Sequence, residues 1–170
     1  MNLVIRNMTL DDVPAVVDLD QRSFSLPWPE RSFRFELTDN PASRCWVAAL
    51  DGKVVGMIVV WLIAHEAHVA TLATHPDFRR RGIAKRLLSH ALQHLVREGA
   101  RSSFLEVRES NLVAQAMYRK FGYTETGRRR RYYRDNDEDA ILMSLDSLEA
   151  ERLAWDNEHS LSDAGEENGR

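Results

Sequence analysis

Cysteine is almost absent from this sequence, since Cys45 is the single one in 170 residues. One cysteine cannot form an internal disulfide, so the chain is not a small disulfide-stapled domain, and this composition suits a reducing compartment. The longest apolar run, residues 54–64, is far shorter than the ~18 residues that suggest a membrane helix. The start, Met1-Asn2-Leu3, lacks the basic and then apolar pattern of a signal peptide. These absences predict a cytoplasmic protein that does not bind membranes.

Two common nucleotide-binding motifs are also missing. A Walker loop ends in Gly-Lys-Ser/Thr, which Lys85-Arg86 does not match, and the dinucleotide fingerprint needs three glycines where only Gly82 is present. The chain has instead Arg79-Arg80-Arg81-Gly82-Ile83-Ala84, between a strand-like run at residues 69–74 and an amphipathic helix. Free N–H groups and the dipole at a helix start favour an anion, and arginines favour phosphate. The stretch is either a phosphate site or a basic turn before a core helix.

The rest of the chain predicts one mixed α/β domain at residues 1–146 and an acidic tail at residues 147–170. The tail has seven acidic and two basic residues, and we expect a short helix in it followed by disorder. Strands are expected at residues 3–6, 45–50, 54–63, 65–74, 103–107, 123–133 and 139–145, and helices at residues 10–24, 30–37, 82–98 and 111–121. In this βααβββαβαββ order, residues 45–74 form an antiparallel meander, and strand 103–107 runs parallel to strand 65–74.

The pattern Arg79-x-x-Gly82-x-Ala84 after a strand resembles the acetyl-CoA signature of the GNAT acetyltransferases. Residues 105–111 and 116–123 resemble the protein N-terminal acetyltransferases of that superfamily, and the nearest type is RimI, which acetylates an N-terminal alanine of a ribosomal protein. Residues 27–30 and Tyr132-Tyr133 also fit this subgroup. The resemblance covers residues 3–145. It implies the GNAT fold, acetyl-CoA as the cofactor that donates acetyl, and a protein N-terminus, that of a ribosomal protein, as the acceptor.

The resemblance also assigns the chemistry. Glu106 lies between apolar Leu105 and Val107, so strand alternation puts its side chain on the opposite face. The resemblance implies that Glu106 is the general base, and that Tyr118, twelve residues later, is the general acid that reprotonates the CoA thiolate. From the residues alone, the alternatives are a solvated or ion-paired glutamate and an ordinary packed tyrosine.

The resemblance implies that acetyl-CoA binds to the end of the strand at residues 65–74, to the signature turn and to one asparagine. These residues are Leu72, Ala73, Thr74, Arg79, Arg80, Arg81, Gly82, Ile83, Ala84, Lys85 and Asn111. The family splays the strand that ends at residues 72–74 from the next strand, so that free backbone groups hold the pantetheine and polarise the thioester carbonyl. Asn111 also suits a helix N-cap. The chain departs from the family at Ala84, commonly glycine, and at His75, commonly acidic.

Three aromatic residues, Trp28, Tyr132 and Tyr133, are candidates for the groove that holds the substrate's N-terminus. Glu109 and Asp135 are candidates to pair with an arginine at the second substrate position.

The arginine run at residues 128–131 suggests nucleic-acid contact, but acidic neighbours at residues 135–139 favour internal pairing. A role in docking a ribosomal protein is the other alternative, and direct nucleic-acid binding is not expected. A metal site is not expected either, because His65 and His68 fall on opposite faces of a strand. The alternative functions are a broad N-terminal, lysine or small-amine acetyltransferase, and a non-catalytic acyl-CoA-binding or RNA-associated module.

Overall fold

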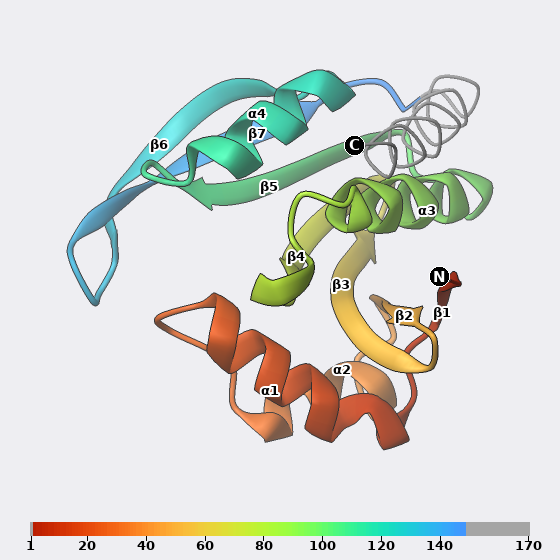
Figure 1. Ribbon diagram of the computed structural model, residues 1–170. Helices are drawn as coiled ribbons and strands as arrows, with labels where there is room; N and C mark the ends of the chain where they lie inside the picture. Colours follow the sequence, from red (N-terminus) through yellow and green to blue (C-terminus); the bar gives the residue numbers. More distant parts are fainter. Residues whose placement is uncertain (1, 149–170) are drawn as a thin grey trace, which may run out of the picture.

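The structure is a computed structural model that describes residues 2–148. It shows a seven-stranded mixed sheet with two helices on each face (Figure 1). The strands are β1 (Leu3–Asn7), β2 (Ser43–Leu50), β3 (Lys53–Ile63), β4 (Glu66–Thr74), β5 (Ser102–Arg108), β6 (Thr124–Tyr133) and β7 (Glu138–Leu145). The helices are α1 (Val13–Ser23), α2 (Glu30–Thr38), α3 (Ile83–Arg97) and α4 (Leu112–Phe121). The tail predicted at residues 147–170 lies, from residue 149 on, outside the described residues.

The strand order is β1-β2-β3-β4-β5-β7-β6, and every neighbouring pair is antiparallel except β4 and β5. The predicted element order, the meander of β2, β3 and β4, and the parallel β4–β5 pair are confirmed. The pattern did not show that β7 would insert between β5 and β6. This insertion makes β6, with its arginine run, an edge strand, and charged side chains are a common way to protect such an edge.

Local signals place the element ends. The Thr9 side chain and the Asp12 carboxylate form the capping box that the sequence predicts, and Arg6 also donates two hydrogen bonds to Asp12. The predicted helix at residues 10–24 therefore begins as a 3-10 turn, Leu10–Asp12, before α1. At the start of α4, Asn111 Oδ1 accepts a hydrogen bond from the N–H of Ala114, as expected for an N-cap.

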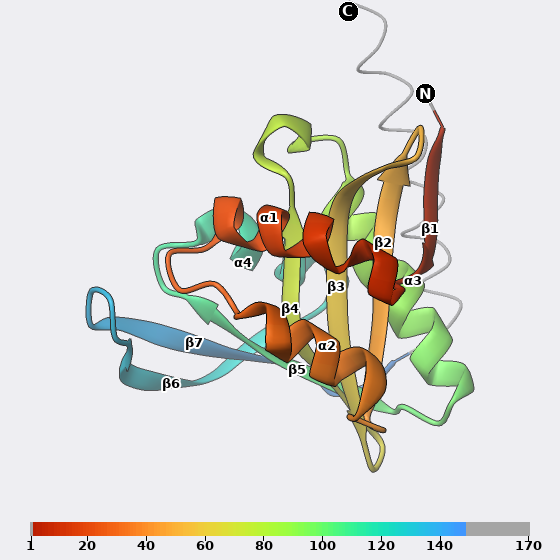
Figure 2. The ribbon, with the colours of Figure 1, turned by 90° about the horizontal axis from the view of Figure 1, so that it is seen from below.

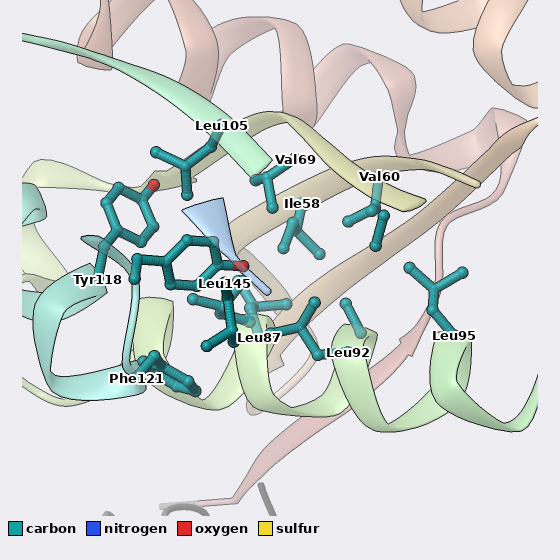
Figure 3. Packing of buried hydrophobic residues seen from close by; sticks show 14 of the residues in the cluster. Ile58, Val60, Val69, Leu87, Leu92, Leu95, Leu105, Tyr118, Phe121 and Leu145 are labelled. Carbon is teal, nitrogen blue, oxygen red and sulfur yellow. The ribbon is translucent and has the colours of Figure 1, made fainter. Parts of the chain in front are cut away.

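The sheet has an apolar core on each face. Helices α1 and α2 cover one face over β1 to β4, whereas α3 and α4 cover the other (Figure 2). Strand alternation divides the buried residues, so that Ile58 and Val60 of β3 pack toward α3 while Met57 and Val59 pack toward α1. Figure 3 shows the larger core, in which leucines of α3 meet β3, β4 and β5.

Helix α3 lies unusually close to β3 at Gly56. A Cβ at this position would lie 2.9 Å from Ile83 Cγ2 and 3.0 Å from Leu87 Cδ1. The absence of a side chain at Gly56 therefore lets the first turns of α3 rest on the strand backbone. This contact fixes where the predicted phosphate-binding turn stands relative to the end of β4. An isolated glycine inside a strand pattern is the signal that identifies such a close approach.

We predict that Gly56→Ala destabilises the protein by about 1–3 kcal/mol, because the added methyl group overpacks the contact with Ile83 and Leu87. Urea unfolding measures the change. Gly127→Ala is the matched control, because its Cβ would meet Leu142 Cδ1 at 3.4 Å, an ordinary contact. Equal unfolding midpoints for the two variants would contradict the close approach.

Candidate active site

Strands β4 and β5 are paired over only part of their length. The paired residues are 66–69 of β4 and 102–105 of β5. Beyond Val69 and Leu105 the strands diverge (Figure 2), while each stays paired on its other side, β4 with β3 and β5 with β7. One backbone edge of residues 70–74 therefore faces a gap in the sheet. This is the splay expected for the strand that ends at residues 72–74.

A β-bulge lies at the start of this gap. Val59 of β3 pairs with Thr71 and Val60 pairs with Val69, so Ala70 has no partner of its own on β3. Bulges re-aim the backbone and occur often beside active sites. Further along, the buried Thr74 Oγ1 has no hydrogen-bond partner within residues 2–148. A buried hydroxyl without a partner beside a gap is suited to bind a ligand.

The turn before α3 has a backbone that is suited to anions. Arg80 has φ 64° and Gly82 has φ 72°, both in the left-handed region, which is unusual for an arginine. Two such residues in one turn give a concave run of backbone N–H groups, as in anion-binding nests. The N–H of Arg86 donates to Gly82 O and closes the first turn of α3. The N–H groups of residues 83–85 are thus left without intrahelical acceptors.

Cations surround this turn. The Arg81 guanidinium lies 5.1 Å and the Lys53 ammonium 5.2 Å from the ring centroid of Phe78. Lys53 comes from β3, and no motif pointed to it. His75, the departure from the acidic residue common in the family, still caps its turn, because Nδ1 accepts a hydrogen bond from the N–H of Asp77 at 3.1 Å. The turn is thus capped by an imidazole where the family commonly has a carboxylate.

Glu106 lies on the face of β5 opposite buried Leu105 and Val107, as alternation predicts. Its side chain is 19% exposed, and Arg129 Nε lies 3.5 Å from its Oε1. Burial first, and then the charge of Glu106, raises the pKa of the neighbouring Tyr132. The Glu106 carboxylate is therefore half-buried, and side chains of β6 lie against it.

Tyr118 is buried in the core on the other face (Figure 3), where its ring lies near Leu105 and its hydroxyl points away from the α4 backbone. Burial raises its pKa, so the phenol stays protonated and able to donate a proton. Within residues 2–148 its hydroxyl makes no hydrogen bond. The hydroxyl of nearby Tyr123, in contrast, donates to Ser103 Oγ at 2.7 Å. Tyr118 thus keeps a free donor that packing alone does not explain.

Glu106 and Tyr118 are on opposite faces of β5, so an intact sheet would separate them. The gap beside residues 70–74 removes this barrier, because a group that passes between β4 and β5 is open to both faces. A carboxylate can act from one side of such a group and a phenol from the other. The sequence pointed to both residues, but only the fold shows how they could share a reacting group.

A network of contacts around Arg108, the brace, lies on the face of the sheet that carries Glu106. Its guanidinium donates to Asp135 at 3.1 Å, to Glu138 at 3.3 Å and to Ser25 at 3.3 Å, and it lies 3.9 Å from the ring centroid of Tyr133. Ser25 belongs to the α1–α2 loop and donates a hydrogen bond to Asp135. Arg108 therefore ties the α1–α2 loop to the β6–β7 hairpin. Nothing in the sequence around Arg108 indicated this role.

The carboxylates of this brace are held in the charged form. Hydrogen bonds from Ser110 lower the pKa of Glu138 to about 2. Hydrogen bonding from Ser25, ahead of that from Arg108, lowers the pKa of Asp135. The brace therefore keeps its charges at all pH values near neutrality.

The three aromatic candidates for the groove are not all in one place. Tyr132 and Tyr133 lie together beside Glu106, with ring centroids 5.2 Å apart. Trp28 packs on Phe33, 5.3 Å between centroids, on the side of α2. There it borders an open hollow of about 540 Å³. The lining residues of this hollow are Trp28, Arg31, Ser32, Phe35, Glu36 and Trp61.

The acidic candidates for a substrate arginine already have partners. Arg128 donates to Glu109 at 2.7 Å, and Asp135 belongs to the brace. In the arginine run of β6, Arg128 also pairs with Glu125 and lies 3.7 Å from Asp139, while the backbone N–H of Arg131 donates to Asp139. Of the acidic residues at 135–139 that were expected as counter-charges, Asp139 is the one that meets an arginine side chain of this run among the contacts recorded for residues 2–148.

The part of the chain that the structure describes has no group of three or more His, Cys, Asp or Glu side chains that could hold a metal ion. None of the helices within residues 2–148 is long and apolar enough to cross a membrane.

Known proteins are similar to this chain in sequence and in fold. Residues 13–123 match the acetyltransferase (GNAT) family. The chain is similar to the ribosomal protein bS18-alanine N-acetyltransferase of Escherichia coli K12, with 33% identity over 152 residues, 83% of this chain and 95% of that protein. It is 34% identical to the N-alpha-acetyltransferase RimI of Mycobacterium tuberculosis over 85% of this chain and 93% of the relative. The crystal structure of the ribosomal-protein-S18-alanine N-acetyltransferase from E. coli superposes with a TM-score of 0.79 at 31% identity, over 87% of this chain and 96% of that one.

We predict that Gly82→Ala weakens acetyl-CoA binding by roughly tenfold in calorimetry. The reason is that a methyl group and a strained left-handed alanine disturb the backbone N–H groups of the turn. Gly99→Ala is the matched control at the other end of α3. Both glycines have positive φ, 72° and 104°, and at both a Cβ would meet no atom within 4 Å. The two variants should lose similar stability, of order 1 kcal/mol. Unchanged affinity in a folded Gly82→Ala protein would remove this turn from the binding site.

Proposed function

The chain belongs to the acetyltransferase (GNAT) family, and from this premise we propose that it transfers acetyl from acetyl-CoA to the N-terminal α-amine of a protein. The proposed acceptor is the N-terminal alanine of a small-subunit ribosomal protein, encountered in the cytoplasm. The observation that carries the proposal is the gap between β4 and β5, with Glu106 on one face and Tyr118 on the other. The acceptor is the one that the bacterial relatives are named for, an alanine of ribosomal protein bS18.

The residues around the gap fit acetyl-CoA, which the family uses as acetyl donor. In our proposal the left-handed turn at Arg80 and Gly82 and the free N–H groups that open α3 bind the pyrophosphate. The free edge of residues 72–74 binds the pantetheine amides, and its N–H groups polarise the thioester carbonyl. The unpartnered Thr74 Oγ1 gives the cofactor a buried hydroxyl to bond. Asn111, which caps α4 after the end of β5, is in our proposal a further contact to the cofactor.

The chemistry needs an amine that has lost its proton and a thiolate that gains one. An N-terminal ammonium has a pKa near ~8, so the base has a modest task. In our proposal Glu106 takes that proton, directly or through a water. The amine attacks the thioester carbon, the C–S bond breaks, and Tyr118 gives its proton to the leaving thiolate. The new amide nitrogen loses its second proton to water, and Tyr118 regains a proton from water. The raised pKa of Tyr118 keeps this proton in place until a strong base forms beside it.

In our proposal an extended N-terminus binds on the Glu106 face, where Tyr132 and Tyr133 lie beside Glu106. Arg108, 3.9 Å from the Tyr133 ring centroid, ties the α1–α2 loop to these rings through Ser25 and Asp135. Bulky rings beside the base leave room for a small first side chain, such as that of alanine or serine. Because Glu109 and Asp135 are already paired, we do not assign either of them to a substrate arginine.

We predict that Glu106→Gln and Tyr118→Phe each lower kcat on the order of 10²-fold, because each removes one proton transfer. Acetyl-CoA affinity, measured by calorimetry, should barely change.

Two control variants separate chemistry from packing. Tyr123→Phe removes a buried hydroxyl that bonds Ser103, so it should cost about 1–2 kcal/mol of stability with little loss of turnover. Glu109→Gln removes an exposed carboxylate three residues from Glu106 and should leave turnover near normal. Near-normal turnover in Glu106→Gln and Tyr118→Phe would mean that the amine arrives deprotonated and that water supplies the acid.

For the acceptor, we predict that peptides beginning with Ala or Ser are acetylated at the α-amine, while peptides with a blocked N-terminus and an internal lysine are poor substrates. Mass spectrometry of a peptide that carries both amines locates the acetyl group. Acetyl mainly on the lysine ε-nitrogen would overturn the N-terminal assignment and leave the family assignment intact.

A further inference from the structure

One arginine of the β6 run is held differently from the other paired arginines. Arg129 lies 3.5 Å from Glu106 Oε1 and is 56% exposed, with its guanidinium 5.5 Å from the ring centroid of Tyr132. Arg128 meets three carboxylates, at 2.7 Å in the shortest pair, and Arg108 is the centre of the brace. The contact of Arg129 is thus long, single and largely solvated, and a pair of this kind is cheap to break.

We propose that Arg129 is a positioning residue that holds the place of the substrate's α-ammonium on Glu106 and withdraws when the peptide binds. This inference rests on the proposed function, because it assumes that Glu106 receives an N-terminal amine. One cation replaces another, so the half-buried carboxylate is never left with a bare negative charge. The exposed face of Tyr132 offers the displaced guanidinium a place to rest, since an arginine binds well over an aromatic ring.

Other groups around Glu106 cannot fill this role. On β4, His68 is stacked on Phe104 with centroids 4.2 Å apart, and burial lowers its pKa, so it stays neutral near pH 7. On β5, Arg108 is committed to the brace. On β6, Tyr132 and Tyr133 are phenols that burial keeps protonated. The β7 residue opposite Glu106 is apolar Leu142. Arg129 is therefore the one cation that faces Glu106 and is loosely held, among residues 2–148.

The exchange has a consequence for selectivity and release. A free N-terminus carries a positive charge and competes with Arg129 for Glu106. The acetylated product is a neutral amide and cannot compete, so Arg129 returns and displaces it. An N-terminus that is already acetylated is excluded for the same reason.

The test compares Arg129→Gln with Arg129→Lys and with Arg130→Gln, a control that removes the same charge from the next residue of β6. The pH dependence of kcat/KM reports the free enzyme, and that of kcat reports the complex. The substrate is a peptide beginning with Ala, whose own ionisation is the same for all variants. A carboxyl ¹³C NMR titration of Glu106 in the free protein supplies a readout that needs no turnover.

We predict that Arg129→Gln moves the acid limb of kcat/KM to higher pH, because the carboxylate of Glu106 loses the cation that lies 3.5 Å from it. On that limb kcat/KM should fall about threefold to tenfold. The acid limb of kcat should stay in place, because in the enzyme–peptide complex Arg129 has already moved away from Glu106. Above the limb, the peptide KM should fall about twofold to fivefold, since the substrate no longer competes. Arg129→Lys and Arg130→Gln should keep the acid limb of the wild-type protein. The NMR titration of Glu106 should likewise shift in Arg129→Gln and stay unchanged in the other two variants.

Three results would overturn the inference. Equal movement of both limbs would mean that Arg129 stays on Glu106 in the complex. No movement of either limb, with an unchanged NMR titration, would mean that the pair has no influence on the base. A raised KM with a lowered melting temperature would make Arg129 a structural brace. If the wild-type protein acetylates no peptide at all, the proposed function fails instead, and the NMR titration still decides whether Arg129 controls Glu106.

Discussion

The short pairing of β4 with β5 is the constraint on which the site depends. Four residues of each strand pair, and then β4 follows β3 while β5 follows β7. A continuous sheet would separate Glu106 from Tyr118 and satisfy the backbone edge of residues 70–74. The divergence leaves that edge free and opens both faces of the sheet to one reacting group. Unpaired backbone groups are costly unless a ligand or water meets them, so the gap is itself a reason to expect a ligand there.

Packing on each side of the gap holds it open. Gly56 brings α3 onto β3 and so sets the anion-binding turn beside the end of β4. On the other side, the pairing of β5 with β7 and the brace of Arg108 keep the hairpin at its angle. The larger core runs under both halves of the sheet, from α3 and β3 to β5, β7 and α4, and the proposed catalytic residues lie where the halves diverge. Such packing would hold these residues in place without further cost at each turnover.

The charged side chains of the site form two groups, one at the turn before α3 and one on the Glu106 face of the sheet. Cations at the α3 turn have no carboxylate against them in the contacts that the structure records there, which suits a phosphate-bearing cofactor. On the Glu106 face, arginines and carboxylates pair with one another, and most of the pairs form brace contacts that stay charged near neutral pH. Arg129 and Glu106 form the loosest pair of that face, with both groups at the groove. A protein that must receive a cation there needs one internal pair that can open.

The sequence by itself determined the element order, the parallel β4–β5 pair, the place of the turn proposed to bind phosphate, and the candidates Glu106 and Tyr118, because periodicity, helix-start chemistry and family motifs are local signals. It did not determine that Glu109 and Asp135 are occupied, that Trp28 packs apart from Tyr132, or that Arg108 braces the groove. Those facts depend on residues up to 110 positions apart, such as Ser25 and Asp135. Which arginine meets which carboxylate is decided by strand register and by the insertion of β7, and neither leaves a local pattern. The tertiary structure therefore decided how the groove is built, since long-range ion pairs are fixed by topology and not by spacing.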